Sequence, residues 1–413
     1  MNRQSEHEGD GAVFVVHPED LGPLLVDQLH LQATSFSPFA ATLADYAPGS
    51  GTVTEDGKAL GGNDSFLAAA AVLARPDLRL DALFGGGMRP LGSLRAYAAK
   101  RAGDMMVAVA PGDGEWDIRL FDAGRDAAAW VAQQLGTAAP EGEPNMLTPP
   151  CSLSTLVAVF HTIDMFRRCA YQDMLEFRRS PDPVMTPQEF RSVAGAGIRS
   201  QDVRWLLPSL LVLVPDLAAQ LGTMADDGLE QAVKRGFLVG TTRAGSTDPV
   251  LLFGEAGRHM GAEFLQSWVG SVGFTVDVVT QGGTRTLHRD YVASTGLANH
   301  WFRFEEKEGV LDVNHQPLSQ EQYAQKLGDL LLSAAVVDRQ ADAAGPFVKP
   351  GNAAAPGRRA KTATGRAADS STAQPAAAGL KFCPGCGAPV KPGAKFCTVC
   401  GRPLTPGAGG GKS

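Results

Sequence analysis

The sequence predicts an α+β protein that carries a small metal-binding module at its C-terminal end. Pairs of short, alternating apolar runs separated by turn residues indicate β-hairpins, and apolar residues at three- or four-residue spacing beside them indicate helices. Residues 343–379 are dominated by Ala, Gly, Pro, Ser and Thr and lack either period. Four of the six cysteines follow within the last 31 residues.

These changes in composition divide the chain of 413 residues into five parts. We expect a first α+β module at 1–148, a second at 149–342, a flexible linker at 343–379, a cysteine module at 380–404 and a disordered tail at 405–413. The linker should be disordered because it cannot bury enough apolar surface to offset its chain entropy. The boundary between the two modules is placed near Pro140 to Pro150.

Two segments of the body have the same order of predicted elements. In each, a hairpin precedes a helix: strands Met105–Ala110 and Trp116–Phe121 before a helix through Leu135, and strands Phe237–Thr241 and Val250–Phe253 before a helix through Trp268. From Gly103 and Gly236 onward the two segments align at an offset of 133 residues without a gap. This favours an internal duplication, with a chance likeness of two similar segments as the alternative.

Further elements can be placed around this repeat. Ser152 to Phe177 reads as a long amphipathic helix, and a capping-box pattern at Ser319 starts a last helix that runs to about Arg339. Leu206 to Val214 is too short for a membrane span and is expected in the core. Two more hairpins are predicted: Phe274–Thr280 with Arg285–His288, and Trp301–Phe304 with Val310–Val313.

Charge is distributed unevenly along the chain, whose net charge is −7. Residues 346–413 hold ten Lys and Arg and a single acidic residue, Asp369, so this segment carries +9 and the remaining chain −16. A basic arm on an acidic body can attract nucleic acid, an acidic partner or the body itself, and it can equally be a solvated linker.

The cysteine module contains two Cys-x-x-Cys knuckles separated by ten residues. Two residues between cysteines allow a tight turn to point both sulfurs at one ion, and two such turns supply the tetrahedral thiolate set that zinc prefers. A glycine follows each knuckle, where a positive φ would direct backbone N–H groups at sulfur. We therefore predict one structural Zn²⁺ held by four ligands: Cys383, Cys386, Cys397 and Cys400.

These residues closely resemble the short zinc ribbons found at one end of many bacterial proteins, and the resemblance covers residues 381–404. Iron of the rubredoxin type is disfavoured because that family places a longer, aromatic-rich segment between its knuckles. Disulfides are disfavoured because the N-terminus shows no signal peptide, so a reducing cytoplasm is expected. Four thiolates leave no open position on the metal, which predicts a structural role.

The second repeated segment also resembles the back half of a winged-helix domain from bacterial regulators. The likeness lies in Leu229–Val239, the following hairpin, and the Glu255–Arg258 start of the next helix. The resemblance would imply DNA binding, but Asp226, Asp227 and Glu230 would repel phosphates. Since Lys234, Arg235 and Arg243 offset them only in part, protein binding is favoured.

No catalytic or cofactor-binding residues are predicted. Gly85–Gly87 and Gly195–Gly197 match no phosphate-binding motif and are expected in turns. His288-Arg289-Asp290 resembles part of a kinase catalytic loop, but the accompanying motifs are missing. Cys151 and His161 would lie about 15 Å apart on one helix, so buried structural roles are expected for both.

Together these features favour a cytoplasmic, non-enzymatic adaptor that docks on a protein partner through the zinc ribbon and linker. One alternative is a nucleic-acid-binding regulator that uses the basic tail, the ribbon and the winged-helix-like modules. A second alternative is an enzyme whose site lies between the two body modules. No membrane partner is expected.

Overall fold

The computed structural model describes residues 11–336 apart from 88, 100–101, 112–114, 136–146, 148–149, 179–184, 222–225, 244, 281–282 and 308–309. Backbone contacts group Met1–Ala344 into one compact unit and Gly345–Ser413 into another. The predicted linker, zinc ribbon and C-terminal tail lie outside the described residues. The first unit is called the body.

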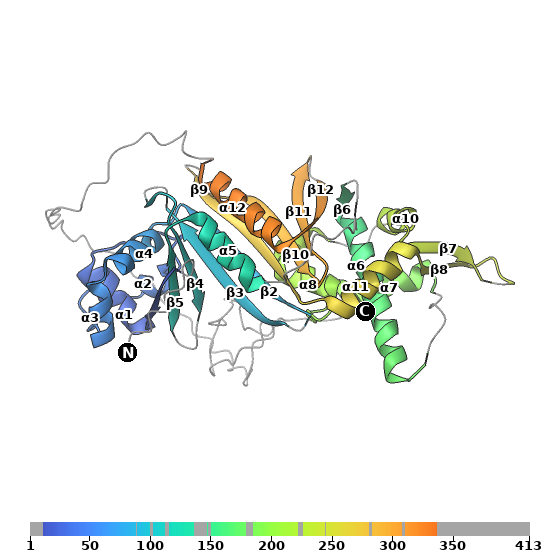
Figure 1. Ribbon diagram of the computed structural model, residues 1–413, viewed down its shortest axis with the longest axis horizontal. Helices are drawn as coiled ribbons and strands as arrows, with labels where there is room; N and C mark the ends of the chain where they lie inside the picture. The colour runs from blue at the N-terminus through green and yellow to red at the C-terminus, as the bar shows by residue number, and fades with distance from the viewer. Residues whose placement is uncertain are drawn as a thin grey trace, which may run out of the picture. The chain divides into compact units, whose positions relative to one another are not determined.

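A ten-stranded antiparallel sheet runs through the body in the order β1-β5-β4-β3-β2-β9-β10-β11-β12-β6 (Figure 1). A separate two-stranded sheet pairs β7 with β8. The strands are β1 (Ala12–Val16), β2 (Leu78–Gly86), β3 (Arg89–Ala98), β4 (Met106–Pro111), β5 (Trp116–Phe121), β6 (Cys151–Ser152), β7 (Leu238–Thr242), β8 (Pro249–Phe253), β9 (Gly270–Thr280), β10 (Gly283–Ser294), β11 (Asn299–Lys307) and β12 (Val310–Leu318).

Helices connect the strands and cover the sheet. In the N-terminal part they are α1 (Pro18–Gly22), the π-helical turn η1 (Pro23–Gln28), α2 (Ala40–Ala44), α3 (Glu55–Gly61), α4 (Asp64–Ala74) and α5 (Gly124–Leu135). In the C-terminal part they are α6 (Leu153–Leu175), α7 (Pro187–Arg199), α8 (Leu206–Leu213), α9 (Pro215–Gln220), α10 (Asp226–Lys234), α11 (Glu255–Ser267) and α12 (Gln320–Val336).

The order of elements is the same on both sides of the centre of the sheet. On one side, the meander β2–β5 is followed by α5, with β1 at the edge; on the other, the meander β9–β12 is followed by α12, with β6 at the edge. The strands β2 and β9 pair at the centre, where Leu78 lies opposite Val278. The body is therefore built from two halves that share one continuous sheet, and the chain passes from the first half to the second between α5 and β6.

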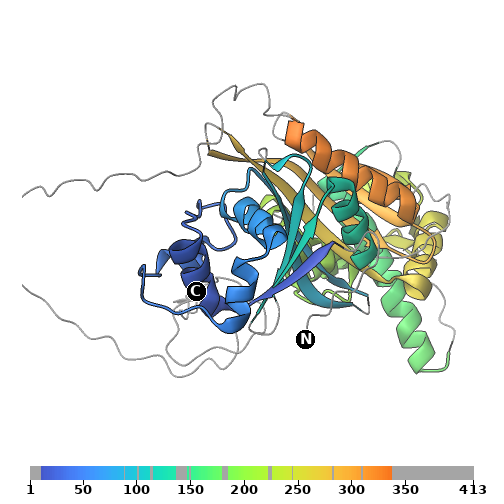
Figure 2. The ribbon, with the colours of Figure 1, turned by 60° about the vertical axis from the view of Figure 1, so that its left-hand side comes forward.

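Three apolar clusters fill the two faces of this sheet. On one face, α5 and α12 pack side by side over the central strands (Figures 1 and 2). On the opposite face, α1–α4 pack against the first half, and α6–α11 pack against the second. Strand alternation separates the faces: Ala96 and Ala108 belong to the cluster under α5 and α12, whereas Tyr97 and Val107 belong to the cluster of the N-terminal helices.

The elements predicted from periodicity are confirmed. The long helix α6 begins at its N-cap Ser152, whose hydroxyl accepts from Thr155 N. The helix α12 follows Ser319, whose hydroxyl accepts from Gln322 N while Gln322 reaches back to Ser319 N. Both later hairpins are present and longer than predicted, and Leu206 to Leu213 forms the buried helix α8. Among the described residues, no helix is long and apolar enough to cross a bilayer.

The two halves of the sheet are not the two segments that were aligned at an offset of 133 residues. Both hairpin–helix segments exist, as β4–β5–α5 and β7–β8–α11, but β7 and β8 lie outside the large sheet. In the sheet, β5 (starting at Trp116) and α5 (starting at Gly124) instead correspond to β12 (starting at Val310) and α12 (starting at Gln320). The strand β3 precedes β4, whereas the helix α10 precedes β7, so the first segment lacks the helix that a winged-helix module requires.

One glycine prediction is also wrong. Gly195–Gly197 lies within α7 and is not a turn, because a capping box at Thr186 and Glu189 starts a helix that continues to Arg199. Gly85–Gly87 is at the β2–β3 turn as predicted, with Gly86 and Gly87 at φ 82° and 56°.

Candidate functional site: an arginine–tryptophan pocket

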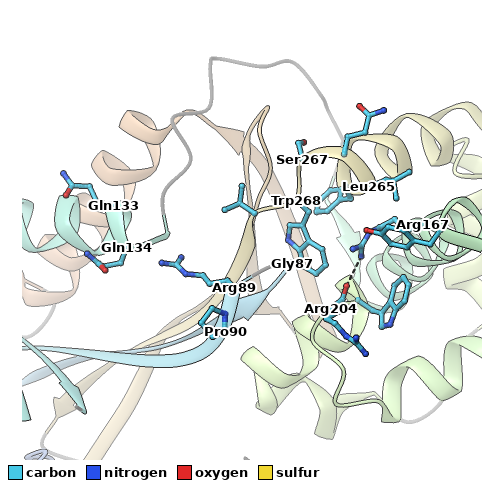
Figure 3. A pocket seen from close by; sticks show the side chains of 15 residues that line it. Gly87, Arg89, Pro90, Gln133, Gln134, Arg167, Arg204, Leu265, Ser267 and Trp268 are labelled. Atoms are coloured by element: carbon cyan, nitrogen blue, oxygen red, sulfur yellow. Dashed lines mark hydrogen bonds between the residues drawn. The ribbon is translucent and has the colours of Figure 1, made fainter. Parts of the chain in front are cut away.

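A pocket of about 920 Å³ lies between the two halves of the body. The first half contributes the β2–β3 turn and the end of α5; the second half contributes α6, the segment before α8, and the end of α11. Figure 3 shows Arg89, Gln133 and Gln134 on one side of the pocket and Arg167 and Arg204 on the other, with Trp268 between them. Its volume lies in the range of small-molecule sites.

The β2–β3 turn can form this wall only because of a glycine. At Gly87, φ is 56°, and an added Cβ would lie 2.8 Å from the carbonyl oxygen of Val269. A side chain there would therefore both strain the backbone and collide with the segment that joins α11 to β9. Gly87 allows the first half to approach the second closely at the pocket.

Arg167 is the most buried of the pocket's charged residues, with 5% of its surface exposed. Its Nη1 donates to Asp164 Oδ1 at 3.3 Å. It also donates to the carbonyl oxygen of Arg204 at 3.2 Å (Figure 3). Its guanidinium stacks over Trp268 at 4.6 Å and lies 5.2 Å from the Trp205 ring centroid. Its Nε is buried and has no hydrogen-bond partner in the described part of the chain.

Asp164 fixes the position of Arg167 and of α8 together. The carboxylate is fully buried and accepts the first N–H groups of α8, from Leu206 at 2.7 Å and Leu207 at 2.9 Å. These donors would otherwise be unsatisfied at a helix start, where a negative charge is also favoured. Burial raises the pKa of Asp164 to about 6, while these N–H groups and Arg167 act in the opposite direction.

Two further arginines line the pocket, and they differ in exposure and in ion pairing. Arg204 is exposed and forms a two-point ion pair with Asp202, at 2.7 Å and 2.8 Å. Arg89 is half-buried, and among the described residues it has neither an ion-pair nor a hydrogen-bond partner; its guanidinium lies over Phe84 at 5.0 Å. Burial lowers the pKa of Arg89 from its ordinary value. None of the residues found to line the pocket is acidic.

Aromatic rings form much of the remaining wall. Trp268 is held by its indole N–H, which donates to the carbonyl oxygen of Gly270 at 3.1 Å. Trp205 packs edge-on against Tyr171 and lies under Arg168 at 4.5 Å. The pocket thus combines planar apolar surfaces with fixed guanidinium groups, an arrangement that suits a ligand with a ring and a negative charge.

Cys151 and His161 are both buried, as expected. The prediction that they share one helix is wrong, because the helix α6 starts only after its N-cap Ser152: Cys151 belongs to the short strand β6 and His161 to α6. Burial raises the pKa of the Cys151 thiol to about 11 and lowers that of His161 to about 3. His161 packs against Phe190, with ring centroids 4.7 Å apart. Neither group is poised for catalysis near neutral pH.

The kinase-like triplet is also structural. His288, Arg289 and Asp290 lie on β10. Asp290 is fully buried and accepts from Trp301 Nε1 at 2.7 Å and Arg303 Nε at 3.0 Å, while Arg289 pairs with Asp216 at 3.2 Å.

A buried polar chain beside the pocket was not found from the sequence. Glu263 on α11 accepts from Thr295 and contacts His300 Nε2 at 2.8 Å, and His300 Nδ1 lies 3.2 Å from His315 Nε2. Its members come from distant segments, so no spacing pattern marks them. For the pocket itself, the only local signals were the adjacent Arg167-Arg168 pair on an apolar helix and the Arg204-Trp205 pair.

The four predicted zinc ligands lie outside the described residues. Their donor set fits zinc, since Cys383, Cys386, Cys397 and Cys400 supply four thiolates in two short-spaced pairs. In the described part of the chain, no group of three or more His, Cys, Asp or Glu is arranged to hold a metal ion.

Comparison with known proteins supports the zinc ribbon and little else. A family model described as a zinc-ribbon domain matches residues 382–404. No curated protein matches the chain significantly. Among solved structures, the chain is similar to the Mycobacterium tuberculosis type VII secretion system chaperone EspG5, solved in complex with a PE25–PPE41 dimer, with 13% identity, coverage of 78% of this chain and 96% of that chain, and a TM-score of 0.34. A likeness at that score carries no argument, so what these comparisons establish is that the chain contains a zinc-ribbon domain at 382–404.

Proposed function

We propose that the protein is a non-enzymatic adaptor whose zinc ribbon docks on a protein partner. The observation that carries this proposal is the division of the chain into a compact body, Met1–Ala344, and a separate unit, Gly345–Ser413, that contains the zinc-ribbon domain. A small domain tethered to a larger one raises its own concentration near whatever the body holds, so two weak contacts act together.

The ribbon suits docking better than chemistry. Four thiolates would fill the coordination shell of zinc and leave no position for substrate or water. The metal would also supply most of the folding free energy, because so short a module has almost no apolar core. Zinc therefore maintains the shape that a partner recognises.

The body offers a surface that can serve the second contact. On the sheet face opposite α5 and α12, Arg79, Asp81 and Arg95 are partly exposed, and they are held by ion pairs to one another and to Asp277. A partly exposed ionic group that is already fixed loses little side-chain entropy when a partner binds.

Variants of the full chain test the docking role of the ribbon. Replacing Cys383 and Cys397 by Ser should abolish zinc binding, measured by metal analysis, and should remove the partner from quantitative affinity capture. Cys169→Ser is the matched control, since Cys169 lies on α6 in the body. Unchanged thermal unfolding of the body would show that only the ribbon was lost. Identical captured proteins with both variants would refute the adaptor role.

A nucleic-acid-binding regulator is the second candidate, favoured by the charge of +9 on residues 346–413. Neutralised phosphates release counterions, so such binding weakens steeply with salt. The test is a salt series with duplex and single-stranded nucleic acid, comparing the wild type with a variant in which Arg358, Arg359, Lys361 and Arg366 become Gln. A steep wild-type slope that the variant lacks would favour the regulator, and no binding at low salt would remove it.

A further inference from the structure

We propose that the arginine–tryptophan pocket binds a small organic anion, a carboxylate or phosphate attached to a planar ring. This proposal does not depend on the adaptor role, since it concerns the body and not the ribbon. It rests on Arg167, Arg89, the aromatic wall and the charge balance at the pocket.

Arg167 is the fixed, buried cation of the pocket. Buried polar atoms are nearly always hydrogen-bonded, so each exception needs an explanation. Arg167 is nine-tenths buried and firmly placed by Asp164 and by stacking on Trp268, yet its Nε has no partner among the described residues. Because Arg167 lines the pocket, its fixed guanidinium is already in position to pair with an anion that enters there.

The local charge balance also favours an anion. Four arginines lie at or beside the pocket: Arg89, Arg167, Arg168 and Arg204. Among the described residues, Asp164 and Asp202 contact these arginines, and both already have partners: Asp164 accepts from α8 and Arg167, and Asp202 pairs with Arg204. Glu263, beside the pocket, is bound by Thr295 and His300. Arg89 therefore remains a cation of the pocket without a counterion among the described residues.

This local positive charge contrasts with the charge of the rest of the chain. The chain outside the basic segment carries −16, so its overall field repels anions. The positive charge at the pocket is therefore local and does not reflect the net charge of the body. The affinity has to come from short-range contacts to individual guanidinium groups, and such contacts are selective for geometry.

The aromatic wall accounts for the planar part of the ligand. Trp205, Trp268 and Phe264 line the pocket together with Gln133, Gln134 and Gln266. Flat aromatic surfaces favour a ring over a flexible chain, and amides can read polar edges on that ring. A free inorganic anion would use the arginines but leave these surfaces unfilled.

The experiment uses the full zinc-loaded chain and isothermal titration calorimetry. Two probes carry both features: adenosine monophosphate, with a phosphate, and 2-naphthoate, with a carboxylate. Adenosine and inorganic phosphate each carry one feature. We expect one site for at least one of the two complete probes, and binding at least roughly tenfold weaker for the half-probes, since a charge-assisted hydrogen bond is worth at least that factor. Which complete probe binds identifies the anion.

Two variants assign the binding to this pocket. Arg89→Gln removes the unpaired cation, and Arg167→Lys keeps a charge for Asp164 but loses Nε and the stacked plane. Each should weaken the bound probe roughly tenfold to a hundredfold. Arg285→Gln, an exposed arginine on β10, is the matched control for net charge and should bind as the wild type does. Far-UV circular dichroism and thermal unfolding check that each variant is folded.

Several outcomes would overturn the proposal. The proposal fails if neither adenosine monophosphate nor 2-naphthoate binds at millimolar concentration. It also fails if adenosine binds as tightly as adenosine monophosphate. Equal affinities for Arg89→Gln, Arg167→Lys and Arg285→Gln would place any binding elsewhere. If Arg167→Lys proves unfolded, Arg89→Gln alone decides, because Arg89 makes no ion pair with the described residues.

Discussion

The two halves of the body share one sheet but fill their interiors differently. In the described part of the first half, the buried side chains are almost entirely apolar, and Asp20 is the single charged side chain among them. The second half buries a series of charged and titratable side chains: His161, Asp164, Arg167, Glu263, Asp277, Asp290 and His300. The same architecture is therefore stabilised mainly by apolar burial on one side and partly by polar networks on the other.

This difference coincides with the position of the pocket. Burying a charge is unfavourable unless it is paired and hydrogen-bonded, so such groups are tolerated where they fix a geometry. Asp164 fixes the start of α8 and the position of Arg167, and Glu263 ties α11 to β11 through His300. These helices carry pocket walls, so the polar core of the second half places the pocket residues.

The largest effect is expected from removing Asp164. Asp164→Ala leaves Arg167 buried without its carboxylate and two α8 N–H groups without an acceptor. Losing one partner of a buried ion pair costs roughly 3–5 kcal/mol. The urea midpoint at pH 7 measures the loss.

Asp20→Ala is the matched variant in the first half. Asp20 accepts from Thr54 N at 2.7 Å and from the Thr54 hydroxyl at 2.6 Å, so its removal loosens the start of α3 but strands no buried cation. Thr54 itself is the N-cap of α3, so the loss is that of the two hydrogen bonds, together roughly 1–3 kcal/mol. If Asp20→Ala cost as much as Asp164→Ala, the polar core would not distinguish the halves.

The next effect is a dependence of stability on pH, and it comes from the second half. Burial and the charge of Arg168 lower the pKa of His161 to about 3, and the pKa values of His288 and His315 are lowered as well, mainly by burial. Such histidines stay neutral when folded but gain a proton when unfolded, so stability is lost as pH falls below 6.5, the ordinary value. Each contributes about 1.4 kcal/mol per pH unit.

Asp164 acts in the opposite direction. Because its folded pKa is raised to about 6, protonation stabilises the fold as pH falls from there to 3.8, the ordinary value. Burial also raises the pKa of Asp290, which acts in the same direction as Asp164. Three histidines outnumber these two carboxyls, so the wild type should lose stability between pH 6.5 and 4.5. His161→Leu should reduce that slope by one proton, measured by urea unfolding at several pH values. An unchanged slope would show that His161 does titrate in the folded state.

Local patterns explain why individual elements were predictable. The strands β9 and β10 and the start of α12 follow from alternation and from capping at Ser319, which act over a few residues. The order of the strands in the sheet cannot be predicted from such local patterns. Its central pair joins β2 to β9, where Leu78 lies opposite Val278, and these residues are far apart in the sequence. The predicted repeat paired the segments ending in α5 and α11, whereas the sheet places α5 opposite α12. In the described part of the chain a hairpin followed by a helix occurs three times, ending in α5, α11 and α12, and the sequence cannot say which of them share a sheet.

The pocket shows the same limit. Its residues come from five separate segments, and each segment alone has an ordinary structural interpretation. The zinc-ribbon domain was identified because its four cysteines lie close together in sequence.

A third prediction concerns the joint between the halves. At Gly273 on β9, an added Cβ would lie 2.2 Å from the carbonyl oxygen of Leu213 at the end of α8. The carbonyl group of Leu213 belongs to the main chain and cannot move aside as the end of a side chain can. Gly273→Ala should therefore destabilise the body by about 1–3 kcal/mol in urea unfolding. Gly240→Ala on β7 is the matched control, since nothing lies within 4 Å of its Cβ position. Equal effects would mean that α8 does not pack closely on the joint.

The smallest effect tests whether charge or shape matters in the polar core. Hydrogen bonds from His300 and Thr295 and the charge of His300 lower the pKa of Glu263, although burial acts against them. Glu263→Gln keeps the size and an acceptor but removes the charge, so it should cost about 1 kcal/mol at pH 7, the typical value of one hydrogen bond. Glu263→Ala removes the acceptor as well and should cost more.

The comparison of these two variants decides what holds α11 against β11. A carboxylate that favours its charged form stabilises the fold above its unfolded pKa and loses that contribution on acidification, so the gap between wild type and Glu263→Gln should narrow as pH falls toward 4. If the gap stays constant with pH, shape and hydrogen bonding alone position α11. In that case Glu263 would act as a hydrogen-bond acceptor, in contrast to Asp164, which faces the buried cation Arg167 and should require its charge.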